Sequence, residues 1–347
     1  MSGALDYARI ITVKPVDIAM SLPLSPGAPA REDSDLAAAR SGSVLALLDH
    51  LGVLQFSGED AEPFLQAQLS CDVASVGARS STYGAYCSPK GRMLANFLLW
   101  REEAGFLMVL SRDIAAAVQR NISKFVLRSK VKVTDASDTI VLAGAAGPKA
   151  EGALRNLVPE LPSRPNEVSR QSDEGTVIRL KDGRFVLSSP PSAVSLLQRH
   201  LESALQSVDA HAWRWLDIRN GWPRVTAATQ DRFVPQMANF ELIGGVSFDK
   251  GCYPGQEVVA RTQHLGKLKR RMFLASVGAP AAAGDDLYSE DLGDQASGTV
   301  VNAEASPDGG HDLLAVVQAA SRERSTVHLK SSAGPVLRFS PLPYAVA

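Results

Sequence analysis

Residues 250–257 read Lys-Gly-Cys-Tyr-Pro-Gly-Gln-Glu and are followed by Val-Val-Ala-Arg. Two glycines and a proline within this short stretch predict a tight backbone turn. Residues 256–265 then predict a helix, with Gly266 as its C-terminal stop. Cys252 would lie just before the N-terminus of this helix, where unpaired N–H groups and the helix dipole favour an anion. Such a position favours the thiolate form of a cysteine, which is the nucleophilic form.

Charged residues near Cys252 could strengthen this effect. Lys250 and Arg261 could place positive charge beside the sulfur, and Glu257 lies four residues before Arg261 on the same helix face. We therefore take Cys252 as the candidate reactive group and Lys250 and Arg261 as its stabilising charges. The other motif residues would shape and orient the loop: Gly251, Tyr253, Gly255, Gln256 and Glu257. The alternative is that Cys252 is a small buried apolar residue behind a structural turn.

Length and composition set the class of protein. A chain of 347 residues can form two or three domains, and 45% hydrophobic with 21% charged residues is typical of a soluble globular protein. The net charge of −1 gives no global reason to bind nucleic acid or an anionic membrane. The three cysteines fit a reducing compartment better than a disulfide framework. Because neither a signal-peptide core nor a long apolar run is found, we expect a cytoplasmic protein without membrane contact.

The order of the elements predicts an α+β fold. Residues 1–35 are rich in turn formers and predict a loosely ordered N-terminal extension. Residues 36–135 show a strand–helix–strands–helix order, which predicts a first α+β domain. Residues 136–266 repeat this order as a second domain that ends in the Cys252 loop and its helix. Residues 267–347 contain short β-prone pieces between Gly, Pro and Asp clusters, which predicts an all-β barrel.

The loop around Cys252 is part of a longer pattern. Residues 244–257, Gly-Gly-Val-Ser-Phe-Asp-Lys-Gly-Cys-Tyr-Pro-Gly-Gln-Glu, resemble the signature of the YgfZ family. Three further stretches match: Ala-Tyr-Cys-Ser-Pro-Lys-Gly-Arg at 85–92, Pro-Gln-Met-Ala-Asn-Phe-Glu at 235–241 and Pro-Leu-Pro-Tyr at 341–344. Members of this family are folate-binding proteins related to the glycine-cleavage aminomethyltransferase and implicated in iron–sulfur cluster maintenance. The resemblance covers the chain from residue 48 to its end.

The resemblance implies an architecture, a ligand and partners. Two α+β domains, the first of them often discontinuous, would form a ring with a C-terminal β-barrel around a central folate site. Tetrahydrofolate or a derivative would be the bound ligand. The protein would assist assembly or repair of iron–sulfur clusters in other enzymes, including those that thiolate tRNA. Its partners would be folate and iron–sulfur enzymes or cluster-assembly proteins. Cys252 would attack or transfer sulfur, or resolve a mixed disulfide.

Two candidate folate contacts bear on the activity. Trp213 lies in a stretch that resembles the family segment whose first tryptophan borders folate, and the alternative is core packing. Asn96 lies on a strand that resembles the one carrying the catalytic aspartate of the aminomethyltransferase, where Ala95-Asn96 replaces an Asp-Asp pair. Asparagine cannot act as a general base. This replacement argues for a non-enzymatic or weakly enzymatic protein over the runner-up function, a folate-dependent aminomethyltransferase or demethylase.

Three further residues are weaker candidates for the pterin edge. Arg219 stands where many relatives have a glutamate. Asn239 and Glu241 precede the Gly244-Gly245 turn and could hydrogen-bond the pterin, although Asn239 could equally bond its own backbone as a turn residue. Family members can have a second tryptophan at the position of Leu51, so the aromatic wall would be thinner here.

The basic run at residues 266–271, the histidines and the cysteine spacings give little further evidence of function. Residues 266–271, Gly-Lys-Leu-Lys-Arg-Arg, could hold a polyglutamate tail or RNA phosphates, or form a solvated face, and predict no more than a weak tRNA contact. The six histidines show no metal-ligand spacing, and the cysteine spacings match no zinc or iron–sulfur pattern. We therefore predict no metal site. Cys71 and Cys87 are predicted to be packing residues.

Overall fold

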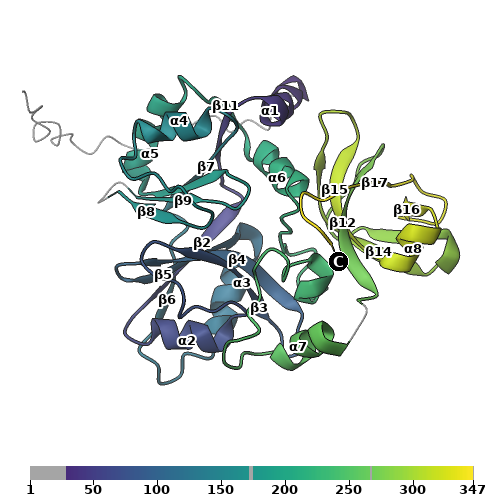
Figure 1. The fold of residues 1–347 in the computed structure, drawn as a ribbon, viewed down its shortest axis with the longest axis horizontal. Coiled ribbons are helices and arrows are strands. Elements are labelled where there is room, and N and C mark those ends of the chain that lie inside the picture. Colours follow the sequence, from purple (N-terminus) through teal and green to yellow (C-terminus); the bar gives the residue numbers. More distant parts are fainter. Residues whose placement is uncertain (1–28, 172–174, 266–267, 347) are drawn as a thin grey trace, which may run out of the picture.

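The computed structural model describes residues 29–171, 175–265 and 268–346. Within these ranges three β-sheets and their helices lie around a common centre (Figure 1). Two sheets come from the first two thirds of the chain, and the third is C-terminal. The mixture of antiparallel sheets and covering helices confirms the predicted α+β class.

The first sheet has the strand order β3-β4-β5-β2-β6 and is antiparallel throughout. Its elements are β2 Leu51–Ser57, α2 Ala61–Gln68, β3 Ser81–Cys87, β4 Met93–Glu102, β5 Gly105–Ser111, α3 Arg112–Ser123 and β6 Lys132–Asp135. Helix α3 buries Ile114, Ala115, Val118 and Ile122, one apolar face of its 3.6-residue period. Strand β4 is buried over most of its length, which gives the near-continuous apolar run of its sequence.

The second sheet has the order β11-β1-β7-β10-β9-β8. Its strands are β1 Val44–Leu47, β7 Val141–Ala146, β8 Val168–Arg170, β9 Thr176–Arg179, β10 Phe185–Ser189 and β11 Gln206–Val208. Its helices are α1 Pro29–Ser41, α4 Ala150–Arg155, α5 Pro191–Leu201 and α6 Ala210–Arg219.

Two predicted boundaries differ from this arrangement. Strand β1 pairs with β7 and β11, so residues 44–47 complete the second sheet rather than the first, although the prediction assigned 36–135 to one domain. Four residues carry too short a pattern to reveal a partner a hundred residues away. The predicted extension of 1–35 lies outside the described residues up to 28. Residues 29–35 are helical, because α1 is anchored by the buried Leu36 and by Asp35, which accepts the Asp209 N–H at 2.9 Å.

The C-terminal sheet has the order β16-β13-β14-β15-β12-β17 and is entirely antiparallel. Its elements are β12 Arg270–Val277, β13 Asp286–Ser289, η4 Glu290–Leu292, β14 Ala296–Ala305, β15 His311–Gln318, α8 Ala319–Arg324, β16 Val327–Leu329 and β17 Arg338–Ser340. Leu337 donates its N–H to Val327 O at 2.8 Å, while β17 pairs with β12. The segment that contains Leu337 and β17 therefore joins both edges of the curled sheet, as the predicted barrel requires.

Helix α6 lies between the second sheet and the C-terminal sheet (Figure 1). Trp215 Nε1 donates to Asp312 Oδ2 at 2.8 Å, and Arg214 pairs with Glu304, so this helix is fastened to the C-terminal sheet. A connecting segment with the 3₁₀ helix η3 Pro235–Ala238 leads back to the first sheet and to α7 Gln256–Leu265. None of the helices in the described ranges is long and apolar enough to cross a membrane.

Candidate functional site

A small cavity of about 60 Å³ lies where the two N-terminal sheets meet, and Trp213 and Asn96 line it. Trp213 is buried with the Arg184 guanidinium carbon 4.3 Å from its ring centroid. A Cβ at Gly144 would lie 2.4 Å from the indole, so only glycine fits beside it. Trp213 is thus packed between a cation and the backbone of β7.

Arg184 is the centre of a buried charge network around this cavity. It is 5% exposed, and its Nη2 lies 2.7 Å from Asp182 Oδ2 and 2.8 Å from Asp217 Oδ1. Arg224 pairs with the other oxygen of Asp217 at 2.5 Å. Burial opposes the charge on Arg184, but the two carboxylates outweigh it and raise its pKa, so the guanidinium stays protonated. Its Nη1 is buried with no hydrogen-bond partner among the described residues.

A second, outer cavity of about 490 Å³ shares Asp217, Trp222 and Arg224 with the inner one. Its volume lies within the roughly 300–1,000 Å³ usual for ligand pockets. His50 lines it, and neither ring nitrogen has a partner in the described structure. Burial, and then the charges of Arg224 and Arg214, hold the pKa of His50 well below its ordinary 6.5. The imidazole is therefore neutral and offers a ligand one donor and one acceptor.

The outer cavity has a wall of mixed charge. Arg112, Arg214 and Arg224 line it together with Asp49, Asp113, Asp217 and Glu304, and Arg214 and Arg224 are ion-paired with two of these carboxylates. Trp222 adds an aromatic surface that stacks on Tyr83 with ring centroids 4.4 Å apart, and His50 adds ring nitrogens without a partner in the described structure. Such a wall can hold a small polar molecule with a planar group. The inner cavity alone is too small for a pterin and has room for only a few waters.

The side chain of Asn96 is engaged within the protein. Its Nδ2 donates to Pro223 O at 2.6 Å, and its Oδ1 accepts the Val225 N–H at 2.7 Å. Asn96 therefore fixes the segment that carries Arg224 and Trp222 into the cavity wall. Both of its polar groups are used by these bonds, which leaves little capacity for a ligand.

The three weaker candidates lie outside both cavities. Arg219 is 3.8 Å from Asp312 Oδ2 on the C-terminal sheet. Asn239, in the left-handed region at φ 56°, donates to Met272 O at 2.8 Å, a conformation that asparagine tolerates. Glu241 is ion-paired with Arg271, although burial still raises its pKa. Asn239 and Glu241 thus join the segment around η3 to β12.

The Cys252 loop lies at the start of α7, which spans Gln256–Leu265, the residues the sequence predicted. Cys252 is exposed, whereas Cys71 and Cys87 are each 2% exposed in the core of the first sheet. Burial raises the pKa of each of these two thiols to about 12. The Tyr253 N–H donates to Gln256 Oε1 at 3.3 Å, which fixes the first turn of the helix.

Lys250 and Arg261 have protein partners of their own. Lys250 Nζ donates to the carbonyl oxygens of Gln66 and Leu69, the latter at 2.6 Å, and so caps the C-terminal end of α2. Arg261 pairs with Glu257 at 3.1 Å on the exposed face of α7. Neither forms a hydrogen bond with Cys252 within the described ranges. The geometry therefore shows Lys250 anchoring the loop, and its predicted effect on the sulfur stays a prediction.

The two glycine-bearing motifs of the sequence contact each other behind this loop. Gly255 has φ 82°, and a Cβ on it would lie 2.4 Å from Ser88 O and 2.6 Å from Gly91 Cα. Gly251 has open space around it and no such requirement. Tyr253 is buried, with its hydroxyl lacking a partner in the described structure and its ring 5.2 Å from Lys250 Nζ. The loop is thus held firmly from behind while Cys252 stays accessible.

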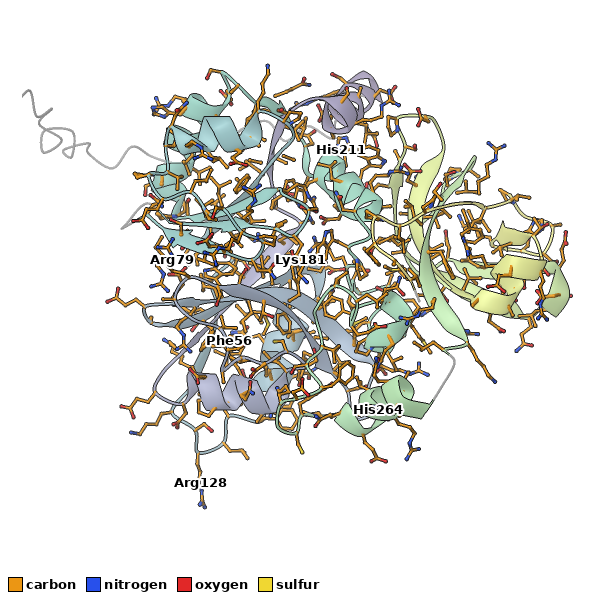
Figure 2. All side chains as sticks on the ribbon, viewed as in Figure 1. Phe56, Arg79, Arg128, Lys181, His211 and His264 are labelled. Atoms are coloured by element: carbon orange, nitrogen blue, oxygen red, sulfur yellow. The ribbon has the colours of Figure 1, made fainter. Side chains whose placement is uncertain are left out.

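Lys181 links the two parts of the site. It lies near the centre of the molecule (Figure 2), in the turn between β9 and β10, and donates to Ile243 O at 2.7 Å. The hairpin that carries Asp182 and Arg184 therefore also supports the Gly244-Gly245 turn that leads to the loop. Sequence reasoning missed His50, Asp182, Arg184, Asp217 and Arg224. Only two of them had a signal in the sequence, because Asp217 lies within the tryptophan-rich stretch that begins at Trp213 and Arg224 lies just after it.

The comparison with solved structures identifies the fold. The fold matches the glycine cleavage system aminomethyltransferase T from Bartonella henselae with a TM-score of 0.76 and 20% identity, over 91% of this chain and 90% of that one. Residues 28–169 match the family described as the GCVT N-terminal domain. The aminomethyltransferase-like arrangement predicted from the sequence is therefore confirmed.

Relatives of known name narrow this class to one family. The chain is 34% identical over 307 residues to the tRNA-modifying protein YgfZ of Sodalis glossinidius (strain morsitans), covering 87% of this chain and 93% of the relative. It is 33% identical over 316 residues to the protein of the same name from Enterobacter sp. (strain 638), covering 90% and 96%. The chain belongs to the YgfZ family.

Proposed function

We propose that this chain is a folate-binding accessory protein in tRNA modification that supports the assembly or repair of iron–sulfur clusters in client enzymes, with Cys252 as its reactive thiol. The observation that carries the proposal is the exposure of Cys252 on a loop whose neighbours are buried or bonded. The name of the relatives, tRNA-modifying protein, supports the process in which it acts.

The chemistry proposed for Cys252 is thiol–disulfide exchange. Its thiol loses a proton to water, and the thiolate attacks one sulfur of a disulfide or persulfide on a client. A new sulfur–sulfur bond forms to Cys252 as the client's own bond breaks, and the second sulfur leaves as a thiolate. In this scheme the exposed sulfur in the loop before α7 is the attacking atom, and Lys250 holds the loop in place from behind.

The folate would occupy the outer cavity. His50 would hydrogen-bond it in the neutral form, Arg112, whose ion pair with Asp138 is exposed, would face its carboxylates, and Trp213 would support Arg184 in the adjoining inner cavity. When bound, a reduced folate would supply ring nitrogens able to carry a one-carbon unit. Aminomethyl transfer is disfavoured because Asn96 lacks a titratable group and is already bonded at both polar groups.

The cysteine role is tested by complementing cells that lack this protein. Cys252→Ser should abolish tRNA thiolation and lower the activity of iron–sulfur enzymes without loss of folate binding. Cys87→Ala, which removes a buried thiol from the core of the first sheet, should lower function only as far as it lowers the amount of folded protein. Full complementation by Cys252→Ser would leave the loop with a structural role alone.

The ligand is tested separately on purified protein. A reduced folate should quench tryptophan fluorescence, and Trp213→Ala should weaken its binding by roughly 1–3 kcal/mol. An unchanged affinity would remove Trp213 from the site. Formation of methylenetetrahydrofolate from an aminomethylated carrier protein at about 1 per second or faster would instead establish the transferase.

A further inference from the structure

A groove of about 630 Å³ lies between the second half of α7, strand β12, helix α8 and the C-terminal segment. Thr262 and Gln263 line it from α7, Arg271 and Phe273 from β12, and Arg322 from α8. It is separate from the two cavities around Arg184, with which it shares no lining residue. Its wall combines hydrogen-bonding side chains, cations and aromatic rings.

Arg322 is held against aromatic rings on the wall of this groove. Its guanidinium carbon is 4.4 Å from the ring centroid of Phe273 and 5.5 Å from that of Phe339, and the two rings meet edge to face with centroids 6.0 Å apart. The residue is nevertheless exposed. A guanidinium fixed on aromatic rings, with its other side toward solvent, is a platform on which a planar base can stack.

Two exposed cations without a carboxylate partner belong to this region. Lys269 and Arg322 form no ion pair with any residue of the described ranges. Their segments are in contact, because the Ala319 N–H at the start of α8 donates to Lys269 O at 2.9 Å. Arg271 on the groove wall is ion-paired with Glu241, and Glu323 is the carboxylate on the wall.

We propose that this groove binds a single-stranded stretch of RNA, with a base on Arg322 and a phosphate on Lys269. The proposal rests on the proposed function in tRNA modification and gives it a substrate-binding surface. Unpaired cations neutralise phosphates, and stacking platforms select exposed bases over paired ones. Thr262 and Gln263 add groups that can hydrogen-bond a base edge. An acidic protein surface would use the cations but would leave the stacking platform without a role.

Helix α7 connects the groove with the loop that carries Cys252. Helix α7 has ten residues and is therefore about 15 Å long. Cys252 lies four residues before Gln256, the first residue of this helix, and the groove is lined by its last turn. An RNA strand in the groove would thus contact the opposite end of α7 from the loop that carries the reactive thiol.

The test is fluorescence anisotropy of the full chain with a labelled single-stranded RNA and with unfractionated tRNA, between about 50 and 200 mM salt. We expect wild-type binding that weakens with salt, and Arg322→Ala to weaken it about tenfold, the scale of one lost stacking contact. Arg322→Lys should keep the salt dependence yet bind more weakly, because lysine has no planar face. Lys269→Ala should lower the salt slope by about one.

Arg128→Ala is the matched control, since it removes an exposed arginine that Figure 2 shows at the foot of the molecule, away from α7 where His264 is labelled. Equal weakening by Arg322→Ala and Arg128→Ala, tighter binding of duplex RNA, or no RNA binding by the wild type would each overturn the proposal. Cys252→Ser should bind RNA normally. The complementation test of Cys252 and the RNA-binding test of the groove can therefore fail independently of each other.

Discussion

Around Arg184, charged side chains from three separate segments are buried and bonded to one another, and little of the network meets solvent. Around Cys252 the arrangement is reversed, because the thiol is exposed while Lys250, Tyr253 and Gly255 hold the loop from behind. The first region stabilises the junction of the two sheets, so a change there acts on the fold. In the second, the Cys252 side chain can be changed with little effect on the fold.

The largest expected effect comes from breaking the buried network. Arg184→Met keeps much of the side-chain volume but leaves Asp182 without its charged partner and Asp217 with Arg224 alone. We expect the free energy of unfolding to fall by about 3–5 kcal/mol, since an uncompensated buried carboxylate is strongly destabilising. Denaturant unfolding measures this loss.

Arg155→Met is its control, because it breaks an exposed pair with Glu151 on α4. Such a surface pair contributes about 0–1 kcal/mol. If both variants lost the same stability, the network around Arg184 would be no more than a set of solvated ion pairs.

The three cysteines provide the next contrast between the regions. At pH 7 we expect iodoacetamide to label Cys252 at least about 100-fold faster than Cys71 or Cys87, because a pKa of about 12 leaves very little thiolate at the two buried sites. Peptide mapping after timed labelling measures the three rates. Similar rates would mean that the first sheet opens readily and that exposure does not distinguish Cys252.

The same contrast explains what could be predicted from the sequence. Helix α7 was placed at its true ends because Pro254-Gly255 and Gly266 are local signals. The roles of Lys250 and Arg184 depend on groups far away in the chain: Lys250 contacts Leu69 O at a separation of 181 residues, and Arg184 contacts Asp217 across 33. Spacing carries no information about such partners, so Lys250 was recognised without its contacts and Arg184 was not recognised at all. Strand β1 was misplaced for the same reason.

Lys250 tests whether the loop is held as the structure indicates. Lys250→Met should lower the free energy of unfolding by about 2 kcal/mol, because hydrogen bonds from a charged group to two carbonyl oxygens at the end of α2 are lost. It should also slow Cys252 labelling if the ammonium supports the thiolate. Lys90→Met, an exposed lysine in the neighbouring turn, is the control. A variant with slower labelling but unchanged stability would assign Lys250 to the sulfur rather than to α2.

The smallest expected effect is a change of stability with pH, which we expect from His50 in the cavity and not from His264 on α7. His50 lies next to Arg214 and Arg224, with Asp49 and Asp113 on the same cavity wall. The fold lowers the pKa of His50 below its ordinary 6.5, so the unfolded chain binds a proton at a pH where the folded chain does not. The part of the free energy of unfolding that depends on a neutral His50 is fully present above pH 6.5 and is lost as the pH falls below 6.5. We expect roughly 1 kcal/mol less stability at about pH 5.5 than at pH 7.5, and His50→Gln should remove most of that difference. His264→Gln, on the exposed end of α7 (Figure 2), should leave it unchanged. Urea unfolding across this range measures both variants, and parallel profiles for wild type and His50→Gln would show that His50 does not resist protonation in the cavity.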